Sequence, residues 1–98
     1  MINHGAYELI VFADDDAGYL QWVKDHPLGY VLNTTKPMLP DFLILHLASC
    51  RAVSGKPGIG NFWTAQSIKV CANEKADLEN WARKEAGGLI SSCNLCNP

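Results

Sequence analysis

The sequence predicts an α+β fold, in which a sheet of about four strands is covered by two helices as a two-layer sandwich. Short runs of β-branched and aromatic residues alternate along the chain with segments that have helical periodicity. The length of 98 residues is close to the commonest size of one domain, so residues 1–98 are expected to form a single domain. Hydrophobic residues make up 48% of the chain and charged residues 18%, a composition that excludes a disordered protein.

Four segments have the composition of strands, because each lacks glycine and proline and is rich in aliphatic, β-branched or aromatic residues. They are residues 7–12, 30–32, 42–47 and 67–71. The segment 42–47 is the most hydrophobic of the four and is therefore expected near the centre of the sheet. His46 lies near the carboxyl end of this segment, and Cys50 follows shortly after the segment ends.

Two helices are predicted from the signals at their ends. The acidic run 14–16 offers an N-cap and first-turn acids to a helix that stops at Pro27. Asn73 is expected to cap a second helix over residues 74–86. The glycine pair 87–88 is expected to end that helix.

The two strand–helix units resemble each other. With an offset of 59 residues, the segment 11–15 aligns with 70–74, and Trp22 aligns with Trp81. An internal repeat explains this likeness. So does the simpler fact that any unit of strand, capped helix and glycine exit needs similar residues.

The charge and the apolar runs restrict the class of protein. A net charge of −2 gives no general attraction to nucleic-acid phosphates, so a nucleic-acid site would need a local patch. No apolar run approaches the roughly 20 residues of a membrane span. Asn3, His4 and Glu8 stand where a secretory signal would have basic and then apolar residues. We therefore expect a cytoplasmic protein with no membrane segment.

Two pairs of potential metal ligands form the main candidate site, His46-x3-Cys50 and Cys93-x2-Cys96. One imidazole and three thiolates are the number and kind of ligands that a tetrahedral structural Zn²⁺ site needs. In a reducing compartment, closely spaced cysteines favour metal binding over structural disulfides. His46 and Cys50 would lie about 13 Å apart in an extended strand, so the prediction requires a bend or helical turn at 47–49.

Other interpretations of these residues stay open. The cysteines can be buried free thiols that act as small hydrophobic side chains, or a disulfide or redox pair. Cys71 can replace His46 in an all-cysteine site, although its alignment with Phe12 favours a core position. A nucleophile–base pair of Cys50 and His46 is not favoured, because nothing marks an oxyanion hole or a third orienting group. We therefore expect no enzymatic activity.

The stretch from His46 to Pro98 resembles the small metal-binding domain of Ada-type phosphotriester repair proteins. The resemblance rests on His46-x3-Cys50, the strand to Cys71, the helix 74–86, Gly87-Gly88 and Cys93-x2-Cys96-Asn97-Pro98. It implies zinc as the cofactor and those four residues as its ligands. The chain lacks the basic residues usual around the ligands in that family, having instead Leu47, Asn94 and Asn97, so the resemblance implies metal binding more than DNA binding. The whole chain is also similar to short bacterial proteins of uncharacterised function.

A second candidate site combines cations with aromatic side chains on the loop 54–61 and its flanks. Its residues are Arg51, Lys56, Phe62, Trp63 and Lys69. Such a combination suits single-stranded nucleic acid or an acidic protein surface. The alternative is that Phe62 and Trp63 turn inward and cover the sheet.

Together these patterns predict a non-catalytic zinc-binding module that acts through protein interaction, in a regulatory role. The first alternative is a nucleic-acid-binding accessory protein that uses the Arg51–Lys69 loop. The second is a thiol-redox protein. The acidic net charge favours a protein partner over a nucleic acid.

Overall fold

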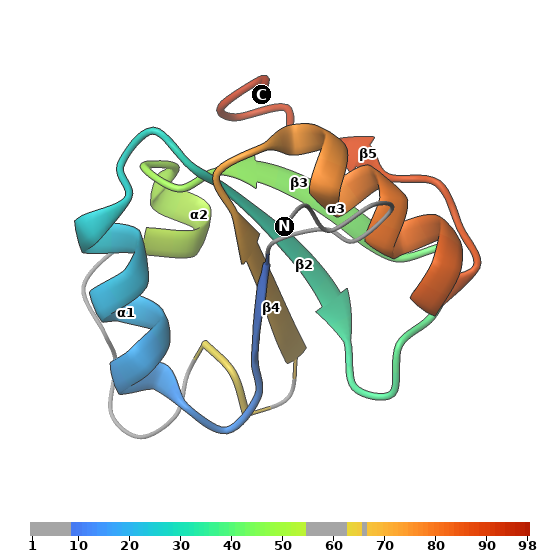
Figure 1. Cartoon of the computed structure of the whole chain (residues 1–98), viewed down its shortest axis with the longest axis horizontal. Coiled ribbons are helices and arrows are strands. Elements are labelled where there is room, and N and C mark those ends of the chain that lie inside the picture. Colours follow the sequence, from blue (N-terminus) through green and yellow to red (C-terminus); the bar gives the residue numbers. More distant parts are fainter. Residues whose placement is uncertain (1–8, 55–62, 66) are drawn as a thin grey trace, which may run out of the picture.

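The computed structural model describes residues 9–54, 63–65 and 67–98, which form a mixed five-stranded sheet with helices on both faces (Figure 1). In chain order the elements are β1 (Ile10–Phe12), α1 (Asp16–Asp25), β2 (Tyr30–Thr35), β3 (Leu43–Leu47), α2 (Arg51–Ser54), β4 (Ser67–Ala72), α3 (Lys75–Trp81), the π-helical segment η1 (Ala82–Ala86) and β5 (Ser91–Ser92). Within these ranges, no helix is both long enough and apolar enough to span a bilayer.

The strands lie in the order β1-β4-β2-β3-β5. β4 pairs antiparallel with β1 and β2, β2 pairs antiparallel with β3, and β5 runs parallel to β3. β1, α1 and β2 therefore form a split β-α-β unit, because β4 is inserted between two parallel strands. Because of this pairing β3, β4 and β5 run in the same direction, and their carboxyl ends lie at the same end of the sheet.

Side chains that alternate along the strands build two cores on opposite faces of the sheet. Val31 and Cys71 belong to the core under α1 and α2, whereas Leu32 and Val70 belong to the core under α3. Figure 1 shows α1 and α2 on one side of the sheet and α3 on the other. The predicted α+β fold is confirmed. The two-layer arrangement is wrong, because the helices are divided between the two faces.

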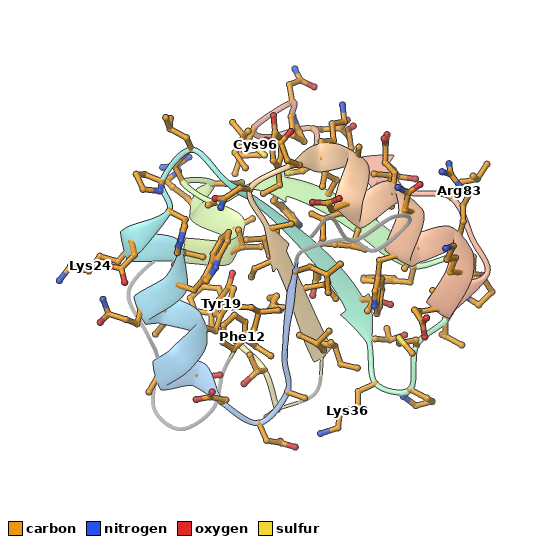
Figure 2. The ribbon with its side chains drawn as sticks, in the orientation of Figure 1. Phe12, Tyr19, Lys24, Lys36, Arg83 and Cys96 are labelled. Atoms are coloured by element: carbon orange, nitrogen blue, oxygen red, sulfur yellow. The ribbon has the colours of Figure 1, made fainter. Side chains whose placement is uncertain are left out.

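The α1 core is closed by aromatic contacts. The rings of Phe12 and Tyr19 meet edge to face with their centroids 5.9 Å apart, between α1 and the sheet (Figure 2). The Tyr19 hydroxyl donates a hydrogen bond to the carbonyl of Val53. This bond fixes α2 against α1 and satisfies the one polar atom of a fully buried side chain.

The helix ends follow three of the four signals predicted from the sequence, and α1 ends at Asp25, just before Pro27. Asp15 is the N-cap of α1, and its side chain accepts a 3.0 Å hydrogen bond from the Gly18 amide. Gly87 ends η1 with a left-handed φ of 72°, as glycine allows. The prediction for Asn73 is wrong: Glu74 is the N-cap of α3, and it makes no side-chain capping bond.

The two strand–helix units are not related by symmetry in the structure. Phe12 and Cys71, which align in the sequence, both face the α1 core. Trp22 and Trp81, which also align, lie on opposite faces of the sheet. The shared pattern therefore reflects the common needs of strand–helix units and not a repeated arrangement.

Candidate metal centre

The register of two parallel strands brings the distant ligand pairs together. β3 and β5 are aligned with Ile44 opposite Ser91 and Leu45 opposite Ser92, so the next row places His46 beside Cys93. The Cys93 amide donates a 2.9 Å hydrogen bond to the Leu45 carbonyl, which extends the pairing by one step. His46 and Cys93, which are separated by 46 residues in the sequence, thus lie side by side on adjacent strands at one edge of the sheet.

A tight turn after β3 reverses the chain and brings Cys50 close to His46. The Cys50 amide donates to the Leu47 carbonyl at 2.9 Å, and the Val53 amide donates to the Cys50 carbonyl at 3.0 Å as α2 begins. The Ala48 amide is held at the same time by the Gly29 carbonyl, also at 2.9 Å. The bend or turn that the metal hypothesis requires at 47–49 is therefore present.

The segment Cys93–Cys96 forms a knuckle whose sulfur atoms accept backbone hydrogen bonds. The Leu95 amide lies 3.3 Å from Cys93 Sγ, and the Leu47 amide lies 3.3 Å from Cys96 Sγ. The Asn97 amide closes the turn by donating to the Cys93 carbonyl at 2.9 Å. Donors directed at sulfur stabilise thiolates, the form in which cysteine binds a metal.

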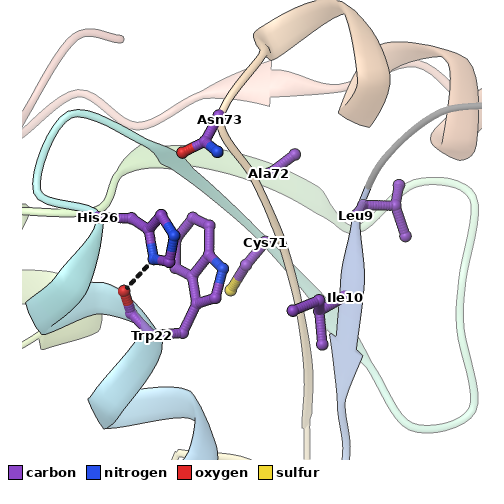
Figure 3. Close-up of a pocket in the computed structure, with 7 residues that line it drawn as sticks. All are labelled: Leu9, Ile10, Trp22, His26, Cys71, Ala72 and Asn73. Atoms are coloured by element: carbon purple, nitrogen blue, oxygen red, sulfur yellow. Dashed lines mark hydrogen bonds between the residues drawn. The ribbon is translucent and has the colours of Figure 1, made fainter.

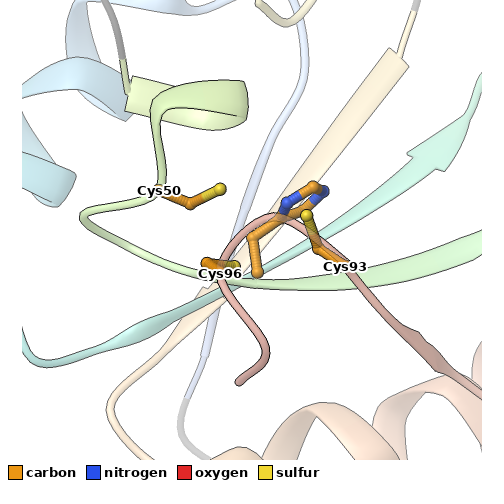
Figure 4. Close-up of side chains that lie close together, drawn as sticks. Cys50, Cys93 and Cys96 are labelled. Carbon is orange, nitrogen blue, oxygen red and sulfur yellow. The ribbon is translucent and has the colours of Figure 1, made fainter.

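The four side chains converge on one point. A ligand atom of each of His46, Cys50, Cys93 and Cys96 lies within 4.8 Å of those of the other three. Figure 4 shows the three cysteines approaching from the turn after β3 and from the knuckle. Zn–S bonds of 2.3 Å in a tetrahedron would place the sulfurs about 3.8 Å apart, so the cluster needs to contract by only about 1 Å.

A buried ring nitrogen supports this fit to a metal. Among the described residues, His46 Nδ1 is buried and has no hydrogen-bond partner, a state that is costly without a ligand. Burial, together with the positive charge of Lys69, lowers the pKa of His46. The imidazole is therefore neutral at physiological pH, as metal coordination requires.

The knuckle thiols differ in their protonation. The amide of Cys96, followed by weaker contributions from other hydrogen bonds, lowers the pKa of Cys93 despite some desolvation. Burial raises the pKa of Cys96 to about 11. A cation in the cluster would displace that proton, so metal binding here releases protons.

Cys71 lies outside the cluster. It is fully buried in β4, and β2 separates it from His46 in β3. Two strand spacings correspond to about 10 Å, too far for a shared ion. The predicted core position of Cys71 is confirmed, and the all-cysteine site is excluded.

The second candidate site does not form a charged surface in the part of the chain that the structure describes. Lys69 is 4% exposed, and its Nζ donates to Asn33 Oδ1, the Trp63 carbonyl and Ser67 Oγ at 2.7–2.8 Å. Trp63 packs inward, with its ring centroid 6.3 Å from that of Tyr19. Of the three members of this site that the structure describes, only Arg51 is exposed. Lys56 and Phe62 lie outside the described residues.

His26, half-buried at the end of α1, stacks on Trp22. The ring centroids are 4.3 Å apart and the ring planes differ by 16°. The spacing of four residues at the end of a helix is the signal that predicts such a contact.

The chain matches no protein-family model, and comparisons with curated proteins and with solved structures also give no match. The resemblance of residues 46–98 to the Ada-type metal-binding domain therefore stays a prediction from the sequence.

Proposed function

We propose that this protein is a non-catalytic zinc module that works by binding another protein. The observation that carries the proposal is the convergence of one imidazole and three thiols within 4.8 Å. Nitrogen and sulfur donors in this ratio suit Zn²⁺ better than the hard cations Ca²⁺ and Mg²⁺, which prefer oxygen. Four protein ligands complete a tetrahedron and leave no position for a substrate or a reactive water, so the role of the ion is structural.

Zinc in this position would hold an exposed segment in one conformation. The knuckle is joined to the sheet through Cys93 and touches the end of β3 through Cys96, and between them Leu95 is 58% exposed. We infer that Leu95, held in place in this way, contributes to the apolar part of the surface that binds the partner. The burial of Lys69 removes one cation from the alternative nucleic-acid surface, which favours the protein partner.

Metal content provides the first test. Native mass spectrometry of protein purified without chelators is expected to show one zinc ion per chain. Cys93→Ser should lose the ion, whereas Cys71→Ala, the matched change outside the cluster, should retain it. If the protein carries no metal and the thiols of Cys50, Cys93 and Cys96 all react with a thiol reagent, the proposal is overturned and the thiol-redox alternative is favoured.

Partner capture provides the second test. Zinc-loaded protein is used as bait in extract of its native cells, next to Leu95→Asp and the control Leu28→Asp, which changes another exposed leucine. A partner that Leu28→Asp retains and Leu95→Asp loses would support recognition through the knuckle. Identical recovery by all baits would contradict it. Loss of the partner after nuclease treatment, with binding that falls steeply with salt, would favour nucleic acid instead.

A further inference from the structure

The four residues of the metal cluster differ in their access to solvent. His46 and Cys50 are buried, with exposed fractions of 6% and 4%, and they form the inner side of the cluster. Cys93 and Cys96 are only half-buried, and they form its outer side. A small reagent in solution therefore reaches the two knuckle cysteines before it reaches the other two ligands.

The two knuckle cysteines are also placed to react with each other. Their Sγ atoms lie within 4.8 Å of one another, and Cys-x2-Cys is a spacing at which redox proteins form a disulfide. A bound cation would hold both side chains as thiolates, which are the form of cysteine that peroxides oxidise. Access, spacing and chemical form thus coincide at Cys93 and Cys96.

The fourth cysteine of the chain is kept apart from this chemistry. Cys71 is fully buried in β4, and Figure 3 shows its side chain directed toward Trp22. It lies about 10 Å from the strand position of His46, too far to form a disulfide with either knuckle cysteine. Cys71 therefore provides a natural control for oxidation of the knuckle.

We propose that the knuckle is a site of reversible oxidation, at which hydrogen peroxide converts Cys93 and Cys96 to a disulfide and thereby releases the zinc ion. The inference rests on the proposed function, and it adds a means by which that function is regulated: oxidation frees the segment that carries Leu95.

The reaction balances with hydrogen peroxide as the only oxidant. One knuckle thiolate attacks a peroxide oxygen, so that the O–O bond breaks, the sulfur becomes a sulfenic acid and the displaced hydroxide takes a proton to form water. The other thiolate attacks that sulfur, forms the S–S bond and expels a second hydroxide, which also takes a proton. The peroxide receives the two electrons that the sulfurs lose. Zn²⁺ leaves without a change of oxidation state.

Oxidation would separate the knuckle from the end of β3. His46 and Cys50 alone leave the ion with two protein ligands, too few for a structural zinc site. The Leu47 amide, 3.3 Å from Cys96 Sγ, loses a thiolate acceptor, and the Leu95 amide, 3.3 Å from Cys93 Sγ, does the same. The knuckle then remains attached through the short strand β5, so Leu95 loses the fixed position that the partner recognises.

Peroxide titration of the zinc-loaded protein tests the proposal. Zinc release, followed with a chromogenic chelator, is expected to parallel a mass decrease of two hydrogen atoms in the tryptic peptide that follows Lys84, which contains both knuckle cysteines. The Leu47 and Leu95 amides should then exchange their hydrogens faster, and a thiol reductant with added zinc should reverse every change. Zinc that is retained, or that leaves without this disulfide, would overturn the inference.

Two variants locate the reaction. Cys96→His keeps a nitrogen ligand for zinc but removes the second sulfur of the knuckle, so it should retain zinc at the peroxide concentration that empties the wild type. Cys71→Ala removes the cysteine outside the cluster and should respond as the wild type does. Release from Cys96→His at the wild-type concentration would contradict the assigned disulfide.

The same measurements separate this inference from the proposed function. The zinc content of each protein is determined before peroxide is added. A wild-type chain that carries no zinc would overturn the proposed function and this inference together. A zinc-loaded chain that keeps its ion in hydrogen peroxide would overturn this inference alone.

Discussion

The two faces of the sheet have different chemical compositions. The core under α3 holds one buried polar residue, Thr34, and is otherwise built from aliphatic side chains and one tryptophan: Leu32, Leu43, Leu45, Val70, Ala72, Leu78, Trp81 and Ala82. The face under α1 and α2 instead contains the cluster of His46, Cys50, Cys93 and Cys96, the buried Lys69 and Asp16, and the buried thiol of Cys71. This difference indicates that stability and chemistry are divided between the faces.

The chemical groups of the α1 face also share one row across the strands. Ile10 pairs with Cys71, Cys71 with Val31, and Val31 with His46. Directly opposed residues point to the same face, so Ile10 and His46 lie at the two ends of this row. Val31, fully buried between Cys71 and His46, keeps these two residues about 10 Å apart.

Removal of the metal should give the largest effect, because it acts where two distant chain segments are joined. When free zinc exceeds its dissociation constant about 1,000-fold, zinc contributes about 4 kcal/mol to the free energy of unfolding. Chelation of zinc, or Cys93→Ser, is expected to remove that amount, measured by urea unfolding. Cys71→Ala should unfold with an unchanged zinc dependence. A stability that is independent of zinc would show that the cluster does not join the segments through a metal.

Truncation in the other core should lower stability without affecting the chemistry. Leu78 is fully buried under α3, so Leu78→Ala is expected to lower the free energy of unfolding by about 3 kcal/mol through lost burial and a cavity. Its zinc content should equal that of the wild type. A loss of zinc would mean that the two faces of the sheet are coupled.

The smallest effect concerns Lys69 and appears in the pH dependence. Burial lowers the pKa of Lys69 from 10.5 to about 8, although Asp16 and Cys71 act in the opposite direction. Between these values the unfolded chain binds a proton that the folded protein has released, so the free energy of unfolding rises with pH, by at most about 1.4 kcal/mol for each pH unit. Lys69→Met should abolish this part of the rise. The free energy of unfolding of the wild type and of Lys69→Met is measured from pH 8 to pH 10.5, and the difference between them gives the contribution of the lysine apart from other titrating groups.

Several features were predictable because their causes are local. The alternation of β-branched and aromatic residues defined β2, β3 and β4 to within a few residues. Asp15 signalled the start of α1 through its capping side chain, and the spacing of His46 and Cys50 required the turn that the structure contains. The candidate ligands His46, Cys50, Cys93 and Cys96 followed from residue chemistry and spacing alone.

Other features were missed because they have no local signal. β5 has two residues, and it is a strand only because β3 offers it a parallel edge. Lys69 was assigned to an exposed patch, since a single sequence does not show that Asn33 and the Trp63 carbonyl would enclose its ammonium group. The prediction that Asn73 caps α3 was wrong by one residue, because a short polar residue before a helix locates the first turn only to within about one residue.

The sequence by itself determined the kinds of groups available: one imidazole and three thiols in two pairs, strands separated by capped helices, and glycines where the chain must turn. Only the tertiary structure decided which of those groups meet. The parallel register of β3 and β5 placed Cys93 beside His46, and the division of the helices between the two faces of the sheet separated the core under α1 and α2 from the core under α3. The physical reason is that propensity and spacing act over a few residues, whereas strand register and helix placement are set by the burial of both faces of the sheet at once.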